Sequence, residues 1–273
     1  MSNHQQEIQS GSRYEFGANW FRFIQHLTPE RITAAQNSLK DSLGEINGLS
    51  FLDAGSGSGL FSLAAMKSGA KVTSFDYDPK SVSTTRYLYQ NYGNSEPTWQ
   101  ILEGSVLDED FIRQLGEFDI VYSWGVLHHT GSMWQAIKNT AVRARVGGRF
   151  FIALYNDQGW LSKFWLAVKK IYCSSPIGKF MMSLIFVPVF AGGGIIKDIL
   201  RGKNPLTRYL KSRDHRGMSP WHDWHDWLGG LPFEVTSPAQ LYKFMAQQGF
   251  ALSSEKLVGG RSGCNEFIFI RQK

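Results

Sequence analysis

The sequence has few cysteines and lacks a stretch typical of a secretion signal. Only Cys173 and Cys264 occur among 273 residues, and their separation fits neither a disulfide framework nor a metal-ligand motif. The first ten residues are polar and hold no apolar segment of the kind found in signal peptides. We therefore expect a protein of a reducing compartment, the cytoplasm.

An apolar run of clear transmembrane length is also missing. Residues 180–196 carry no formal charge, but this run is short for a helix that crosses a bilayer, and Pro188 and residues 192–194, all glycine, interrupt it. A buried pair of helices joined by a turn is our expectation. The alternative is peripheral contact with a membrane, because Lys and Arg flank the run on both sides.

Acidic residues are too few to balance the basic ones. The chain has 29 Lys and Arg against 23 Asp and Glu, and residues 156–220 concentrate the excess, with eleven Lys and Arg against three Asp. An anionic partner is expected for that segment: a phosphorylated substrate, a lipid surface or a nucleic acid. Nucleic acid is the least favoured of these, because no recognisable RNA-binding module accompanies the charge.

Short apolar runs alternate with helical stretches in the first half of the chain. This alternation predicts a doubly wound, mostly parallel sheet with right-handed crossovers. The helical stretch 132–146 is expected to end at Gly147 and Gly148. The five expected strands of this part are residues 49–53, 71–75, 99–102, 118–123 and 149–155.

The glycine-rich turn after the first expected strand lacks the third glycine of a dinucleotide site. Asp53 ends the strand, and Gly55, Gly57 and Gly59 follow at alternate positions, so that Leu60 stands where that glycine belongs. Closely spaced glycines still let the backbone approach a ligand. The pattern suits a cofactor that has no pyrophosphate and whose amino-acid end offers an ammonium group to an acid.

Side chains suited to a nucleoside follow the next two strands. Asp76 ends the second strand, where an acid accepts hydrogen bonds from both hydroxyls of a ribose, and Tyr77 comes directly after it. Ser105 and Val106 follow the third strand and offer small and apolar surface to a flat ring. The ends of parallel strands meet at one crevice, so these side chains are expected to share a site.

In order and spacing, these segments resemble the class I (Rossmann-like) S-adenosylmethionine-dependent methyltransferases over residues 45–155. The resemblance implies a seven-stranded sheet of order 3-2-1-4-5-7-6, a helical insert before the last two strands, and S-adenosyl-L-methionine as cofactor. Asp53 and the glycines would contact its methionine part, Asp76 its ribose, and Ser105 and Val106 its adenine. The expected cofactor contacts are Asp53, Gly55, Gly57, Gly59, Asp76, Tyr77, Ser105, Val106, Ser123 and Trp124.

Four segments are expected along the chain. Residues 1–48 form an N-terminal arm and a first helix, with the aromatic cluster 14–20 as a lid over the cofactor. Residues 49–155 form the cofactor-binding core. Residues 156–245 form a helical insert that binds the substrate, and residues 246–273 supply two closing strands, at 250–257 and 266–271.

Two histidines follow the fourth expected strand, next to the predicted methyl group. Methyl transfer to a hydroxyl requires alignment of the nucleophile and removal of its proton, and the pKa of histidine suits that task. His129 is our preferred base and His128 the second candidate. The alternative is that both side chains only orient the loop.

The insert supplies the expected substrate contacts, and no metal is expected. A repeated Trp-His-Asp unit at 221–226 offers ligand-type side chains, but their helical spacing places at most two on one face. We read this segment as part of the substrate pocket. The expected substrate contacts are Tyr155, Trp221, His222, His225 and Trp227.

The leading hypothesis is O-methylation of a small-molecule, glycan or lipid-linked acceptor, for which negative charge fits the basic insert. An RNA (tRNA) methyltransferase is a second hypothesis, and a non-catalytic cofactor-binding partner subunit is a third. The sequence leaves the acceptor and the oligomeric state open.

Overall fold

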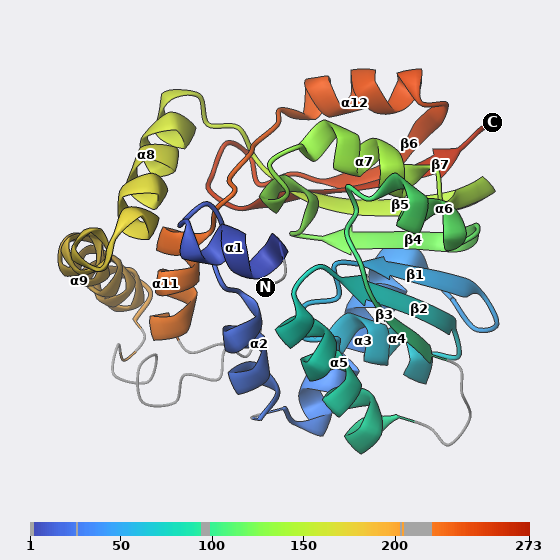
Figure 1. Cartoon of the computed structure of the whole chain (residues 1–273), viewed down its shortest axis with the longest axis horizontal. Coiled ribbons are helices and arrows are strands. Elements are labelled where there is room, and N and C mark those ends of the chain that lie inside the picture. The colour runs from blue at the N-terminus through green and yellow to red at the C-terminus, as the bar shows by residue number, and fades with distance from the viewer. Residues whose placement is uncertain (1–2, 26, 94–98, 203, 205–219) are drawn as a thin grey trace.

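A seven-stranded sheet forms the centre of the computed structural model, which describes residues 3–25, 27–93, 99–202, 204 and 220–273 (Figure 1). The strand order is β3-β2-β1-β4-β5-β7-β6, which confirms the predicted topology. The strands are β1 (Ser50–Ala54), β2 (Lys71–Asp76), β3 (Trp99–Glu103), β4 (Phe118–Trp124), β5 (Ala144–Tyr155), β6 (Phe250–Lys256) and β7 (Cys264–Arg271).

Only β7 runs against its neighbours. β1 to β5 pair in parallel, whereas β7 pairs antiparallel with both β5 and β6. The first five strands therefore place their carboxyl ends at one edge of the sheet, where ligands of such sheets bind. Tyr155, the last residue of β5, is opposite Cys264, the first residue of β7.

Helices cover both faces of the sheet because alternate residues of the inner strands are apolar and fully buried. Phe51 of β1 faces one layer, and Leu52 faces the other. The first layer consists of α3 (Pro29–Leu43), α4 (Leu60–Lys67) and α5 (Pro79–Tyr92). The second consists of α6 (Glu109–Gln114), α7 (Met133–Ala141) and α12 (Pro238–Gln247), and the short 3-10 helix η1 (Leu127–His129) precedes α7.

The expected helix over 132–146 is too long. α7 ends at Ala141, and β5 already begins at Ala144, which pairs with Phe118 of β4. Gly147 and Gly148 lie inside β5, at the point where the register with β4 shifts. Strand pairing across the sheet overrides the local helical pattern here, and the two glycines fit the irregularity of the strand.

Two helices that the sequence did not reveal occupy the N-terminal arm. α1 (Asn3–Gln9) and α2 (Gly17–Ile24) precede α3, and α2 packs against α5. Pro29 begins α3, a position at which the fixed φ of proline suits a helix, and Thr28 precedes it. The aromatic cluster 14–20 thus leads into α2, and the arm reaches the carboxyl edge of the sheet (Figure 1).

Long helices form the described part of the insert. α8 (Trp160–Ser174), α9 (Pro176–Leu200) and α11 (Pro220–Gly229) pack on one another at one side of the sheet (Figure 1). The predicted turn near Pro188 and residues 192–194 is wrong, because α9 continues through all of them. A proline removes one helical hydrogen bond, and contacts of α9 with α8 and α11 hold the helix together across that point.

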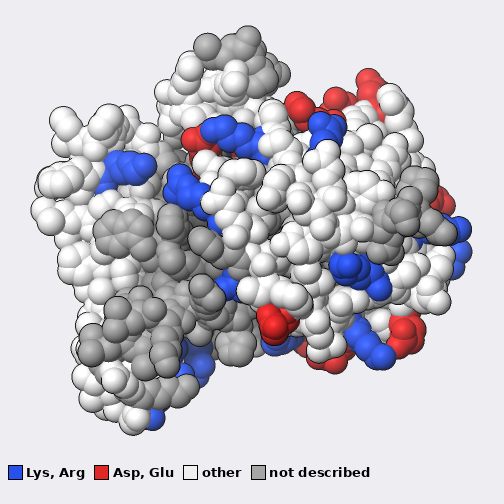
Figure 2. Space-filling view, turned by 90° about the horizontal axis from the view of Figure 1, so that it is seen from below, with Lys and Arg blue, Asp and Glu red and all other residues white. Residues whose placement is uncertain are grey.

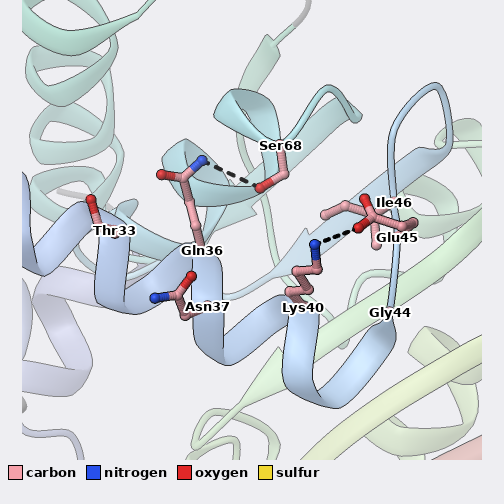
Figure 3. Close-up of a pocket in the computed structure, with 8 residues that line it drawn as sticks. All are labelled: Thr33, Gln36, Asn37, Lys40, Gly44, Glu45, Ile46 and Ser68. Carbon is pink, nitrogen blue, oxygen red and sulfur yellow. Dashed lines mark hydrogen bonds and ion pairs between the residues drawn. The ribbon is translucent and has the colours of Figure 1, made fainter.

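A polar hollow of about 250 Å³ lies at the opposite edge of the sheet, where the strands begin (Figure 3). It is bordered by α3 and by the end of α4. The amide of Gln36 donates to Ser68 at 3.5 Å, and Lys40 forms an ion pair with Glu45 at 2.7 Å. This hollow is separated from the predicted cofactor residues by the length of the strands.

Candidate active site

The glycine turn after β1 is held against the end of β2. The backbone N–H groups of Gly55 and Ser56 both donate to the carbonyl oxygen of Phe75, at 2.9 and 3.1 Å. Gly55 has a φ of +89°, and a Cβ atom at this position would lie 2.3 Å from Val126. Only glycine satisfies both the conformation and the space, so the turn keeps its backbone close to the end of β4.

Two carboxyl groups lie beside this turn, Asp53 buried and Asp76 partly buried. Asp76 accepts hydrogen bonds from the N–H groups of Gly57 (2.8 Å) and Asp78 (2.9 Å), and burial raises its pKa to about 6. Asp53 accepts from the hydroxyl of Ser62 at 2.5 Å, and burial, together with the nearby Asp76, raises its pKa to about 7. A bound cation would favour the ionised form of both groups.

A cavity of about 270 Å³ opens between the ends of β2 and β3. Its lining includes Tyr77 and Ser105, two of the residues predicted to contact the cofactor. Asp76 immediately precedes Tyr77 along the chain. The structure thus brings Tyr77 and Ser105 to one cavity, and the roles of Asp76 and Val106 toward the cofactor stay predictions. Further lining residues are His4, Pro79, Glu103, Gly104 and Asp108, of which the sequence did not reveal His4.

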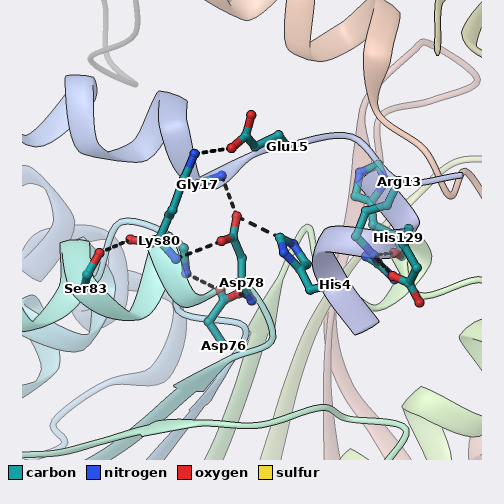
Figure 4. A network of polar contacts seen from close by, with 11 residues as sticks. His4, Arg13, Glu15, Gly17, Asp76, Asp78, Lys80, Ser83 and His129 are labelled. Carbon is teal, nitrogen blue, oxygen red and sulfur yellow. Dashed lines mark hydrogen bonds and ion pairs between the residues drawn. The ribbon is translucent and has the colours of Figure 1, made fainter. Parts of the chain in front are cut away.

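The N-terminal arm borders this cavity through His4, and Figure 4 shows its contacts with the residues that follow β2. Asp78 accepts a hydrogen bond from the N–H of Gly17 at 2.9 Å, and His4 lies 3.8 Å from the same carboxyl group. The ring of His4 meets the ring of Tyr77 edge to face at 5.2 Å, and the guanidinium of Arg13 lies 5.0 Å from the centre of that ring. The prediction of an arm near the cofactor site thus agrees with these contacts.

The same arm reaches the glycine turn and the histidine pair. A Cβ atom at Gly57 would lie 3.2 Å from the indole of Trp20. Arg13 donates a hydrogen bond to the backbone oxygen of His129 at 3.0 Å, and the ring of Phe16 lies 5.1 Å from the ring of His129. No sequence pattern pointed to Arg13, because its partners lie far along the chain.

His129 is fixed by the segment that follows α11. Its Nδ1 atom lies 2.6 Å from the carbonyl oxygen of Pro232. A carbonyl oxygen only accepts, so Nδ1 donates, and in the neutral ring Nε2 then carries the free lone pair. Burial lowers the pKa of His129 to about 3, and Lys169 and Arg13 add to the decrease. The ring is therefore neutral at ordinary pH.

His128 lies deeper than His129. Its side chain is fully buried. The centre of its ring lies 4.0 Å from the ring centre of Tyr155 and 4.4 Å from that of His129. Within the described part of the chain, neither ring nitrogen of His128 has a hydrogen-bond partner. Burial holds the pKa of His128 well below its usual value, so this side chain is also neutral.

Aromatic side chains and one lysine connect the histidines to the insert. Phe233 lies 5.4 Å from Tyr155, measured between ring centres. The ammonium of Lys169 lies 5.0 Å from the ring of Phe233 and 5.2 Å from the ring of Trp227, and it donates to the backbone oxygen of Trp227. A chain of contacts through Phe233 and Lys169 therefore connects the predicted substrate contacts Tyr155 and Trp227. No sequence pattern indicated Lys169 or Phe233.

His225, another predicted substrate contact, is held by α8. The Nδ1 atom of His225 lies 2.9 Å from the hydroxyl of Tyr172, which belongs to α8. The side chains of Trp221 and His222 lie outside the described part of the structure. Among the side chains that are described, no group of three or more His, Cys, Asp or Glu is arranged for a metal ion.

Three predicted cofactor residues make contacts within the protein. The hydroxyl of Ser123 is buried and donates to the backbone oxygen of Ala54 at 2.8 Å, which ties β4 to β1. Val106 is buried in the core beneath α7. The indole of Trp124 donates to Glu266 at 3.1 Å. Their role toward the cofactor stays a prediction.

Comparison with known proteins identifies the domain that carries this site. Residues 52–152 match the methyltransferase domain family, and no curated protein matches the chain. Magnesium protoporphyrin IX methyltransferase from Synechocystis, solved with bound S-adenosylmethionine, is similar over 99% of this chain and 98% of its own, with a TM-score of 0.56 and 13% identity.

Two further solved structures share the architecture. A methyltransferase from Haloferax volcanii in complex with the Trm112 activator is similar over 96% of this chain and 98% of its own, with a TM-score of 0.54 and 12% identity. An O-methyltransferase family protein from Burkholderia thailandensis is similar over 92% of this chain and 62% of its own, with a TM-score of 0.51 and 14% identity. At these identities the likeness establishes the fold.

The family match adds the chemistry that the fold alone leaves open. It spans the glycine turn, both carboxyl groups and the histidine pair. The strand order and the cavity at the ends of β2 and β3 agree with it. Residues 52–152 therefore form a methyltransferase domain, and the chain shares the fold of methyltransferases solved with bound S-adenosylmethionine.

Proposed function

We propose that the chain transfers a methyl group to a hydroxyl of a small-molecule, glycan or lipid-linked acceptor that carries negative charge. The orientation of His129 is the observation that carries this proposal. The acceptor lies, in this proposal, between the histidine pair and the insert, and the methyl donor lies on the other side of the histidines.

The residues at the strand ends fit S-adenosylmethionine. This cofactor supplies an electrophilic methyl group on a sulfonium centre. Asp53 and Asp76 would hold its cationic and hydroxylated parts, because both carboxyl groups gain from a nearby positive charge or a hydrogen-bond donor. Tyr77 and Ser105 line a cavity that suits its nucleoside. The glycine turn supports this assignment, since a side chain at Gly55 would overlap Val126.

His129 has the form that a general base requires. Nδ1 is engaged by Pro232, so the free lone pair is on Nε2. The lowered pKa keeps the ring unprotonated at neutral pH and also makes Nε2 a weaker base than an ordinary histidine, so the proposal rests on the orientation of the ring. In the proposed reaction the hydroxyl oxygen bonds to the methyl carbon as the bond from that carbon to sulfur breaks. The hydroxyl proton passes to Nε2 of His129, and the sulfur leaves as a neutral thioether.

The acceptor side combines aromatic surface with one buried cation. Tyr155, Phe233 and Trp227 offer flat apolar surfaces, and Lys169 lies against two of them. Lys169 is almost fully buried, so its charge is weakly screened and favours an anionic group nearby. This arrangement supports a phosphorylated or otherwise acidic acceptor over a neutral one.

A label-transfer experiment tests the proposal. The protein is incubated with methyl-labelled S-adenosylmethionine and fractionated cell extract, and the labelled product is then treated with mild alkali and, separately, with nuclease. Label in a small or glycan fraction that survives alkali indicates a methyl ether and supports the proposal. Nuclease-sensitive label would favour an RNA acceptor. Absence of label with intact cofactor binding would favour a non-catalytic partner subunit.

A further inference from the structure

One side of α9 is a continuous apolar surface. The helix has 25 residues, and the most apolar 18-residue stretch has a mean hydropathy of 1.8 with none of it buried. Ile177 exposes 75% of its surface and Leu200 exposes 82%. Soluble proteins rarely leave so long an apolar surface in water. The other exposed apolar residues of α9 are Phe180, Met181, Leu184, Ile185, Val189, Ile195, Ile196 and Ile199.

The opposite side of α9 packs on the rest of the insert. Phe186 and Phe190 lie 5.3 and 6.1 Å from Trp165 of α8, and Phe190 also lies 5.8 Å from Trp227 of α11. Buried helices of soluble proteins share the apolar composition of α9, but not its exposure. The helix therefore packs on α8 and α11, and its apolar side faces outward, far from the sheet (Figure 1).

Basic side chains surround this surface, and exposed acidic ones are missing from it. Between residues 158 and 202, Asp198 is the one acidic residue, and it is buried. α9 lies at the left of Figure 1. The described residues at the left side of Figure 2 accordingly show Lys and Arg in blue among white atoms, without the red of Asp and Glu. The exposed cations of this segment are Lys163, Lys170, Lys179, Lys197 and Arg201.

We propose that α9 lies in the surface of an anionic lipid bilayer, with its apolar side in the outer acyl region and these cations at the headgroups. An apolar helical side with a basic border is the feature by which interfacial helices bind such membranes. A second copy of the chain fits this surface poorly, because it would bring the same cations together without an exposed acid to pair them.

The packing of α9 favours a position in the plane of the membrane over a membrane-spanning one. Lys179 and Lys197 are separated by five full turns at about 3.6 residues per turn, so they share one side of the helix, away from the apolar residues. α8, which packs along α9, carries the exposed Lys163 and Lys170. A spanning helix would have to draw these polar side chains into lipid.

Flotation of the full-length protein with vesicles tests the proposal. Vesicles of phosphatidylcholine are compared with vesicles that also contain phosphatidylglycerol. Val189→Glu places a charge on the apolar side of α9, and Val146→Glu is a matched control, because both valines expose 61% of their surface and Val146 lies in β5. We expect binding to the anionic vesicles, a roughly ten-fold loss in Val189→Glu, and no change in Val146→Glu.

Charge and orientation are tested in the same assay. The double variant Lys163→Gln/Lys170→Gln and added salt should each weaken binding to anionic vesicles, and alkaline carbonate should release the bound protein. Absence of binding to anionic vesicles at low salt would overturn the proposal, and so would equal loss in the two valine variants. Resistance to carbonate would overturn the in-plane position. A dimer broken by Val189→Glu would assign the surface to a second copy. Vesicle binding requires no methyl transfer, so this test is independent of the proposed acceptor.

Discussion

The Nδ1 atom of His129 lies 2.6 Å from the carbonyl oxygen of Pro232. The segment around Pro232 is itself held by the N-terminal arm, because the N–H of Tyr14 donates to the carbonyl oxygen of Leu231 at 3.0 Å. The orientation of the proposed base therefore depends on two segments outside the methyltransferase domain match, one before it and one after it. In the proposed reaction the insert and the arm would therefore orient the base.

Replacement of His129 by Gln should lower kcat by about 10² to 10⁴-fold, because the hydroxyl proton loses its acceptor. The affinity for S-adenosylmethionine should change by no more than about two-fold, since the glycine turn and both carboxyl groups are untouched. Turnover on the identified acceptor and calorimetric titration of the cofactor check the two parts. A variant with full turnover would show that alignment alone suffices.

Cofactor affinity should rise with pH between about 5 and 8 and then level off. Asp53 and Asp76 have pKa values raised to about 7 and about 6, so most of each is protonated at pH 5 and must lose its proton to hold the cationic and hydroxylated parts of the cofactor. Titration calorimetry in two buffers of different ionisation enthalpy, at pH 6, should reveal proton release. In Asp76→Asn the affinity should fall, and the pH dependence should become weaker. A flat affinity profile in the wild type would contradict the role of both carboxyl groups.

Asp78→Ala should destabilise the protein by about 3 kcal/mol, because Asp78 both caps α5 and accepts from the N–H of Gly17. Asp108→Ala is the matched control. Asp108 caps α6 with two backbone hydrogen bonds but does not contact the arm, so its loss should cost about 1 kcal/mol. Urea unfolding gives both values. Limited proteolysis should cleave the arm faster in Asp78→Ala alone, and equal rates would show that the arm is held by other contacts.

His128→Phe should make the protein more resistant to acid. In the folded protein the pKa of His128 is well below 6.5, whereas in the unfolded chain it is near 6.5. Below about pH 6.5 the unfolded state therefore binds the proton and the folded state does not, so the free energy of unfolding falls as the pH falls. Unfolding curves at pH 7.0 and 5.0 should show a smaller difference for the variant, by about 1.4 kcal/mol for each pH unit below 6.5. An unchanged difference would mean that His128 is protonated in the folded state.

Most of the sheet could be predicted because the local sequence of its strands indicates them directly. Apolar runs bounded by turns marked β1 to β4 to within a residue or two, and the family resemblance supplied the strand order. The start of β5 was missed, because the pairing of Ala144 with Phe118 is a contact across the sheet that local periodicity does not report. The glycines at 147 and 148 were read as a helix stop for the same reason.

The candidate site was predictable only where it follows the strands. Asp76, Tyr77 and Ser105 reach one edge of the sheet through the topology itself. Arg13, Lys169 and Phe233 approach His129 or its neighbours through tertiary packing of the arm and the insert, which have no regular alternation to place them. The continuity of α9 was missed because proline and glycine weaken a helix in isolation, whereas contacts with α8 and α11 support it.

The antiparallel position of β7 has a consequence for synthesis on the ribosome. Tyr155 at the end of β5 pairs with Cys264 at the start of β7, so the entire insert is translated before β5 receives this neighbour. Until then one edge of β5 presents unpaired backbone groups while the apolar side of α9 is also exposed, a combination that promotes aggregation of nascent chains. Chains whose synthesis stops anywhere in the insert also have this open edge. The pairing of β7 with β5 is therefore the step that completes the native sheet.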